Sequence, residues 1–156
     1  MDQLTITTET PLQDDVRVMV RDLNETMIPL TPRQFQFQLT VEQMAEPSVT
    51  VFVARDASGR AVGMGSLKDH GDGVGEVKRM WTLPEVRGLR VGSALVGRIE
   101  ALAREKGIRR LVLETGEALG FEAAYRVYER AGFSRCGAVL DYPDSGFSRF
   151  YEKILT

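Results

Sequence analysis

The sequence has few of the residues that build metal sites and disulfides. Among its 156 residues it holds one cysteine, Cys136, and one histidine, His70. A single cysteine excludes an internal disulfide, and the pair is too small for a cysteine/histidine metal site. The neighbouring residues favour a small buried strand residue for Cys136 and an exposed loop residue for His70. We therefore expect no metal.

The sequence also lacks a basic excess and long apolar runs. It has 20 lysines and arginines against 22 aspartates and glutamates, a net charge of -2. A protein that mainly holds nucleic acid would normally be basic, so that function is disfavoured. No apolar run approaches the roughly 20 residues of a membrane span, and the N-terminus does not resemble a signal peptide. We expect a cytoplasmic protein with neither a nucleic acid nor a membrane as partner.

What is present is apolar sequence along the whole chain, with 43% hydrophobic residues, which predicts a single domain over 1–156. Alternating and helical periodicities predict one α/β domain with a mixed sheet. The segment 31–47 is ambiguous, because "FQFQLTV" alternates like a strand while Thr31-Pro32 and Pro47 favour a helix, which we predict. The crossover helix at 91–106, ended by Gly107, should make the strands on either side of it parallel. The expected strands are 4–10, 49–55, 61–69, 75–83, 108–115, 134–140 and 147–155. Two more helices are expected, one at 11–27 and one within 121–133 that ends at Gly132.

Three glycine-containing stretches are candidates for a ligand loop. "GDGVGE" at 71–76 precedes a strand, so it predicts a hairpin turn. "GMGS" at 63–66 lies inside a strand and predicts a bulge or a close backbone approach. Only "RGLRVGSAL" at 87–95 lies directly between a strand and a helix, where free N–H groups, the helix dipole and arginines form a phosphate site. It lacks the Lys-Ser/Thr pair of the P-loop enzymes.

The stretch Arg87-Gly88-Leu89-Arg90-Val91-Gly92 resembles motif A, Q/R-x-x-G-x-G/A, of the GNAT superfamily of acetyl-CoA-dependent N-acyltransferases. "AAYRVYERAGF" at 123–133 resembles the second signature of that family, A-x-x-L-Y-E-x-x-G-F. The resemblance implies a mostly antiparallel mixed sheet of about seven strands with a splayed parallel pair, flanked by about four helices. It also implies acetyl-CoA as co-substrate, with no metal. Arg90 departs from the family, which has glycine there.

The resemblance also implies where the co-substrate lies. Its pyrophosphate should lie on the N–H groups of Gly88 to Ser93, with Arg87 and Arg90 nearby to contact a phosphate. Its pantetheine arm should follow the end of the strand 75–83, where a backbone N–H would stabilise the oxyanion. The expected binding residues are Met80, Trp81, Thr82, Arg87, Gly88, Leu89, Arg90, Val91, Gly92, Ser93 and Tyr125.

Two catalytic residues are implied in the same way. Tyr128 matches the family tyrosine that acts as general acid near the sulfur, with Tyr125 as the substitute, although Tyr128 could also simply pack helix on sheet. Glu76, at the start of the strand 75–83, is the candidate base, directly or through a water, although it could also be a solvated strand end. Period-two alternation should place Glu76, Lys78, Met80 and Thr82 on one face of the sheet.

The expected reaction is direct attack of a small-molecule primary amine on acetyl-CoA in a ternary complex. The acceptor should be bounded by the segments 24–38 and 141–151. Few acidic residues lie there, which favours an amine that also carries a carboxylate or an aromatic group. Arg33 or Arg149 would be its counter-ion, near Phe35 and Phe37. The alternatives are a non-catalytic acyl-CoA-binding or regulatory module and, more weakly, a nucleic-acid binder; a homodimer is left open.

Overall fold

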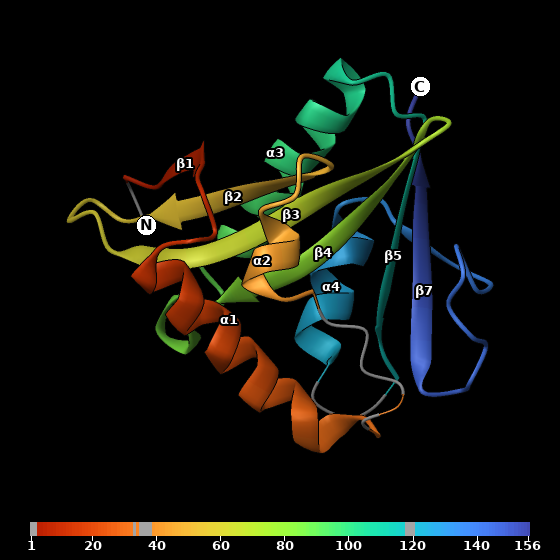
Figure 1. Cartoon of the computed structure of the whole chain (residues 1–156), viewed down its shortest axis with the longest axis horizontal. Helices are drawn as coiled ribbons and strands as arrows, with labels where there is room; N and C mark the ends of the chain where they lie inside the picture. The colour runs from red at the N-terminus through yellow and green to blue at the C-terminus, as the bar shows by residue number, and fades with distance from the viewer. Residues whose placement is uncertain (1–2, 33, 35–38, 118–120) are drawn as a thin grey trace.

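A computed structural model describes residues 3–32, 34, 39–117 and 121–156 of the chain. Its strands form one seven-stranded sheet in the order β1-β2-β3-β4-β5-β7-β6 (Figure 1). The strands are β1 Thr5–Thr8, β2 Val49–Arg55, β3 Ala61–Gly71, β4 Val74–Thr82, β5 Arg110–Gly116, β6 Ser134–Cys136 and β7 Ser148–Ile154. The helices are α1 Asp14–Met27, α2 Val41–Met44, α3 Val91–Glu105 and α4 Glu122–Arg130, with 3-10 turns η1 Ile28–Leu30 and η3 Pro84–Val86.

The sheet is mixed, as the sequence predicts. β4 and β5 pair in parallel, and the other neighbouring strands pair antiparallel. The crossover through α3 accounts for the parallel pair. β7 lies between β5 and β6, so the edge strand on this side of the sheet is β6 and not the last strand of the chain.

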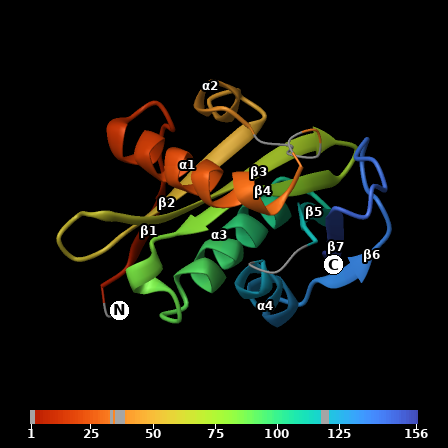
Figure 2. The same cartoon turned by 90° about the horizontal axis from the view of Figure 1, so that it is seen from below.

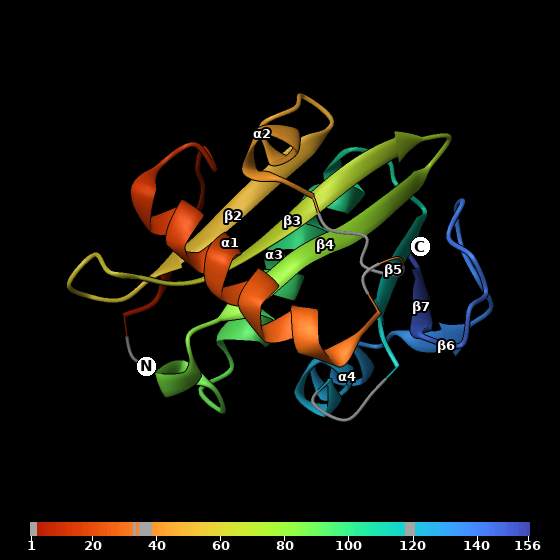
Figure 3. The same cartoon turned by 60° about the horizontal axis from the view of Figure 1, so that its bottom comes forward.

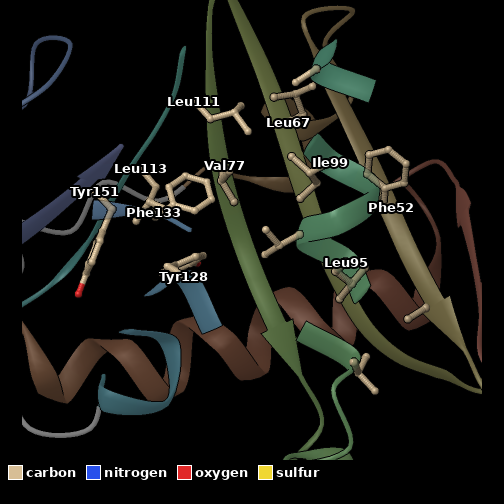
Figure 4. Packing of buried hydrophobic residues seen from close by; sticks show 14 of the residues in the cluster. Phe52, Leu67, Val77, Leu95, Ile99, Leu111, Leu113, Tyr128, Phe133 and Tyr151 are labelled. Carbon is tan, nitrogen blue, oxygen red and sulfur yellow. The ribbon is translucent and has the colours of Figure 1, made fainter. Parts of the chain in front are cut away.

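Helices cover both faces of the sheet. α1 and α2 lie on one face, and α3 and α4 lie on the other (Figure 2). The larger core lies on the α3/α4 face, where Phe52, Leu67 and Val77 of the sheet meet Leu95 and Ile99 of α3 (Figure 4). The smaller core packs α1 against β2 and β3, and α1 also lies across β4 (Figure 3). Among the described residues, no helix has the length and apolar character that a membrane span requires.

The "GMGS" stretch lies beside a bulge, but the extra residue belongs to the neighbouring strand β4. The register of β3 against β4 shifts between Met64 and Ser66. A Cβ added to Gly65 would lie 2.4 Å from the sulfur of Met80 and 3.2 Å from Ile99 of α3. The groups that approach Gly65 are therefore side chains and not the predicted backbone, and their closeness favours glycine here.

The helix predicted at 31–47 is wrong for most of the segment that can be described. Thr31 has extended backbone, and the helix there is only α2, which begins after Thr40. Thr40 and Gln43 form a reciprocal capping box, which is the stronger start signal. Phe35 and residues 36–38 lie outside the described residues. The strand expected at 134–140 is also shorter, and its half-buried Cys136 ends β6.

Candidate active site

The parallel strands β4 and β5 separate after a short paired segment. Their paired residues end at Glu76 and Val112, although β4 continues to Thr82 and β5 to Gly116. Figure 1 shows the two strands diverging toward their C-terminal ends. Beyond Glu76, the edge of β4 therefore has backbone groups with no partner in β5, and such an edge can pair with another extended chain.

A bulge in β4 lies beside this opening. Arg79 has φ of 56°, and the register shifts so that β4 has one more residue than β3 between Lys78 and Trp81. An extra residue reverses the alternation of side chains along the rest of the strand. The predicted common face of Glu76, Lys78, Met80 and Thr82 is therefore wrong. Met80 and Thr82 contact the α3 face, while Glu76 and Lys78 point to the opposite face.

The turn between β4 and α3 has the backbone of an anion site. Gly88 has φ of 84°, and Arg90, the N-cap of α3, has the left-handed φ of 67°. The first intrahelical bond joins the Ala94 N–H to the Arg90 carbonyl at 3.0 Å, so the preceding amides of the first turn have no intrahelical acceptor. The hydroxyl of Ser93 is buried without a hydrogen-bond partner among the described residues.

The other predicted binding residues surround this turn. Arg87 is exposed. Its guanidinium lies 4.7 Å from the centroid of the Trp81 ring, and it donates a hydrogen bond to the Thr82 carbonyl at 3.2 Å. Leu89 is an exposed apolar side chain. A Cβ on Gly92 would lie 3.4 Å from Val127 of α4, so the start of α3 packs close to that helix. Of the remaining predicted residues, Val91 is buried, and Met80, Trp81 and Thr82 are half-buried.

Glu76 is the centre of a buried polar cluster and is only 2% exposed. Its carboxylate oxygens lie 2.8 Å from His70 Nε2 and 3.2 Å from Lys78 Nζ, and it accepts a hydrogen bond from the Tyr142 hydroxyl. The interpretation of Glu76 as a solvated strand end is therefore wrong. The loop predicted for His70 is wrong, because His70 belongs to β3. The prediction that His70 is an exposed residue is confirmed, although its side chain is only 25% exposed.

Sequence reasoning missed a second carboxylate, the half-buried Glu114 of β5. The Ser148 hydroxyl donates to it at 2.7 Å. Burial raises the pKa of Glu114, the negative charge of Glu76 adds to the rise, and the Ser148 hydrogen bond and the Lys78 charge oppose it. The sequence feature that could have indicated Glu114 is a single charged residue after the apolar residues of the strand "LVLET". Glu76 and Glu114 thus come from the two strands that diverge.

Tyr128 and Tyr125 of α4 are both buried but have different surroundings. The Tyr128 ring packs against Phe133 and Tyr151, with centroids 5.9 Å and 6.1 Å away. Burial, followed by the charge of Glu114, raises the pKa of Tyr128, so its hydroxyl keeps its proton at neutral pH. The Tyr125 hydroxyl instead donates to the Gly116 carbonyl.

The structure rules against one of the predicted acceptor counter-ions. Arg149 already pairs with Glu117, at 2.8 Å and 2.9 Å, and its guanidinium lies 3.8 Å from the ring centroid of Tyr125. The hydrogen bonds that Arg149 donates to the Glu117 carboxylate raise the pKa of Arg149, so the charge of this cation is already balanced. The other predicted acceptor residues, Arg33, Phe35 and Phe37, lie outside the described residues.

The sheet has a diverging parallel pair and a bulged β4, and the turn before α3 has amides without an intrahelical acceptor. This arrangement is that of the acyl-CoA-dependent N-acyltransferases. The model of the acetyltransferase (GNAT) family matches residues 17–133. The chain therefore belongs to the GNAT family and is an acetyltransferase, and the family implies the use of acyl-CoA.

Individual relatives agree with this assignment. The chain is 37% identical to a protein of Azospirillum brasilense named IAA acetyltransferase, over 99% of this chain and all of that protein. A crystal structure from Klebsiella pneumoniae, described as a candidate acyl-CoA N-acyltransferase, has a TM-score of 0.80 at 29% identity and covers 98% of both chains. An N-acetyltransferase of Thermoplasma acidophilum solved with coenzyme A shares the fold, with a TM-score of 0.74 at 15% identity over 98% of this chain and 99% of that one.

Proposed function

We propose that this protein transfers an acetyl group from acetyl-CoA to the primary amine of a small molecule, by direct attack in a ternary complex. The observation that carries the proposal is the opening between β4 and β5. An unpaired strand edge there adjoins two carboxylates, the buried Glu76 and the half-buried Glu114, and the protonated hydroxyl of Tyr128. An amine acceptor needs these groups, because an ammonium must lose a proton before it attacks.

The turn 87–93 fits the phosphates of acetyl-CoA. Free amides at the start of α3 and the unpartnered Ser93 hydroxyl supply donors at the positive end of the helix dipole. The side chains of Arg87 and Arg90 add positive charge at an exposed surface. Bound acetyl-CoA supplies an activated acyl group in the form of a thioester.

The residues of the chain then have three tasks. Glu76, directly or through a water, accepts the proton of the substrate ammonium. A backbone N–H of Met80, Trp81 or Thr82 on the unpaired edge of β4 stabilises the developing oxyanion. Tyr128 donates its proton to the departing sulfur; its raised pKa makes it a weak acid but ensures that the proton is present.

The test of this proposal is the release of coenzyme A thiol from acetyl-CoA in the presence of a panel of amines. We expect release that depends on an amine, with a matching N-acetylated product by mass spectrometry. IAA, for which a relative is named, is assayed separately as a further candidate acceptor, because it is not a primary amine. Tight binding of acetyl-CoA without transfer to any amine would instead favour a non-catalytic acyl-CoA-binding module.

Replacing Arg90 with glycine should change stability and affinity in opposite directions. A non-glycine residue in the left-handed region costs about 1–2 kcal/mol, and the added chain entropy of glycine offsets about half of this. We therefore expect a rise in the free energy of unfolding of about 0.5–1 kcal/mol. The lost guanidinium–phosphate contact should weaken acetyl-CoA binding by roughly three- to tenfold, as measured by calorimetry.

Asp72 supplies the matched control for this variant. It is exposed in the β3–β4 turn with a left-handed φ of 55°. Asp72→Gly should also raise stability, but it should leave acetyl-CoA affinity unchanged. Equal affinities of Arg90→Gly and the wild type would show that the Arg90 side chain does not contact the phosphates.

A further inference from the structure

Arg79 is a buried cation with no buried anion to match it. Its side chain lies at the β4 bulge, and the residue is 7% exposed. Among the residues that the structure describes, its hydrogen-bond partner is Asn24 on α1, whose side-chain oxygen accepts from Nη2. Burial lowers the pKa of Arg79 to about 10, so the guanidinium remains charged at neutral pH. No carboxylate pairs with it among the described residues, and the sequence has no acidic residue at 33, 35–38 or 118–120.

Two further unpartnered polar atoms belong to the same face of the sheet. Within the described part of the chain, the buried side-chain polar atoms without a hydrogen-bond partner are Ser66 Oγ, Arg79 Nε, Trp81 Nε1 and Ser93 Oγ. Ser66 pairs with Lys78 in the β3–β4 register, and Trp81 pairs with Met64 of the α1-side core. Ser66, Arg79 and Trp81 therefore lie around the bulge on the face that α1 covers, and each of them can donate a hydrogen bond.

An anion bound at this position would accept hydrogen bonds from the three buried donors, one of which is charged. A buried charge is unfavourable unless it is paired, and a buried donor is unfavourable unless it is bonded. A single planar guanidinium matches the two oxygens of one carboxylate, whereas a phosphate dianion would usually need more positive charge. Lys78, the neighbouring cation in β4, is already bound to Glu76 and Tyr142.

On this basis we propose that Arg79 binds a carboxylate of the acceptor, so that the substrate class is small amines that also carry a carboxylate. This inference rests on the proposed function. Arg79 lies three residues after Glu76 in β4, about 10 Å along the strand, so one small molecule can place its ammonium near Glu76 and its carboxylate at Arg79. Arg79 thus takes the role predicted for Arg33 or Arg149.

The experiment compares amino acids with the amines that lack their carboxylate. The pairs are 5-aminopentanoate with butylamine and 6-aminohexanoate with pentylamine, measured as kcat/KM, because in these amino acids the ammonium and the carboxylate lie at opposite ends of the molecule. We expect the wild type to prefer the carboxylated member by about tenfold or more, because a site with unpaired donors rejects the analogue that lacks the acceptor. In Arg79→Met the preference should disappear, with the loss mainly in KM for the amino acids and little change for the decarboxylated amines. Equal losses for both members of a pair would overturn the inference.

Asn24→Asp separates substrate binding from a purely structural role of Arg79. This change keeps the cation but places a carboxylate of the chain beside it. We expect a higher melting temperature, because the buried charge gains a partner, together with a weaker preference for carboxylated substrates. A higher melting temperature with an unchanged preference for carboxylated substrates would mean that Arg79 only stabilises the packing of α1 on the sheet.

A binding measurement distinguishes failure of this inference from failure of the proposed function. Calorimetry in the presence of coenzyme A would use N-acetyl-amino acids against the corresponding N-acetyl-amino-acid amides. Carboxylate-dependent binding that Arg79→Met abolishes would support the site even if no amine were acetylated. Acetylation of amines with no preference for a carboxylate in either assay would leave the proposed function intact and overturn the carboxylate site.

Discussion

Replacing Tyr128 with phenylalanine is expected to lower kcat by about ten- to a thousandfold, with little change in acetyl-CoA affinity. The ring packs against Phe133 and Tyr151, and phenylalanine keeps that packing. What the variant loses is the hydroxyl near Glu114, which is the proposed proton donor to the departing sulfur. Single-turnover kinetics with a saturating amine, together with calorimetry of acetyl-CoA binding, would measure the two quantities separately.

Tyr125→Phe is the matched control, because both tyrosines are buried on α4. Its hydroxyl donates to the Gly116 carbonyl, so its removal should cost about 1 kcal/mol of stability and change kcat little. The opposite pattern, with the large kcat loss in Tyr125→Phe, would make Tyr125 the acid and Tyr128 a packing residue.

The fold was predictable where local signals agreed. The helix at 91–106 has apolar residues on one face and Gly107 at its end, and the structure places α3 there. The motif-based expectation of a splayed parallel pair agrees with the end of pairing at Glu76. The helix prediction for 31–47 was wrong because it placed the helix start at Thr31-Pro32. The helix instead begins at a capping box formed by the side chains of Thr40 and Gln43.

The candidate site was less predictable because its geometry depends on strand register. A bulge at Arg79 reverses the faces of Met80 and Thr82, and periodicity alone does not reveal it. Another register shift in the β3–β4 hairpin accompanies the contact of His70 with Glu76. The pairing of Arg149 with Glu117 joins residues 32 positions apart, and nothing in the local pattern of either one indicates it.

Replacing Glu76 with glutamine is expected to lower kcat/KM most at neutral pH and to restore part of it at high pH. Glutamine keeps the size of the side chain and one of its two acceptor oxygens but removes its basicity. At high pH the amine loses its proton without help, so the missing base matters less. A pH–rate profile of the variant against the wild type, taken at temperatures where both are folded, provides the measurement.

Glu114→Gln is the control that distinguishes the role of Glu114 from that of Glu76. Burial raises the pKa of Glu114 above its ordinary value of 4.5, so its ionised form destabilises the folded state, and the wild type loses stability as the pH rises through that pKa. The glutamine variant lacks this loss, so its advantage in unfolding free energy should be absent below about pH 4.5 and grow above it. Glu76→Gln should instead lower stability at neutral pH, because Lys78, only 10% exposed, loses its carboxylate partner.

The kinetic profiles of the two variants then identify the base. If Glu76→Gln shows the pH-dependent rescue and Glu114→Gln does not, Glu76 takes the ammonium proton. The reverse result would assign that task to Glu114, whose raised pKa brings it closer to that of a general base at neutral pH. A uniform loss across pH in Glu76→Gln would mean that Glu76 positions Lys78, His70 and Tyr142 rather than moving a proton, and no loss in either variant would leave bulk water as the base.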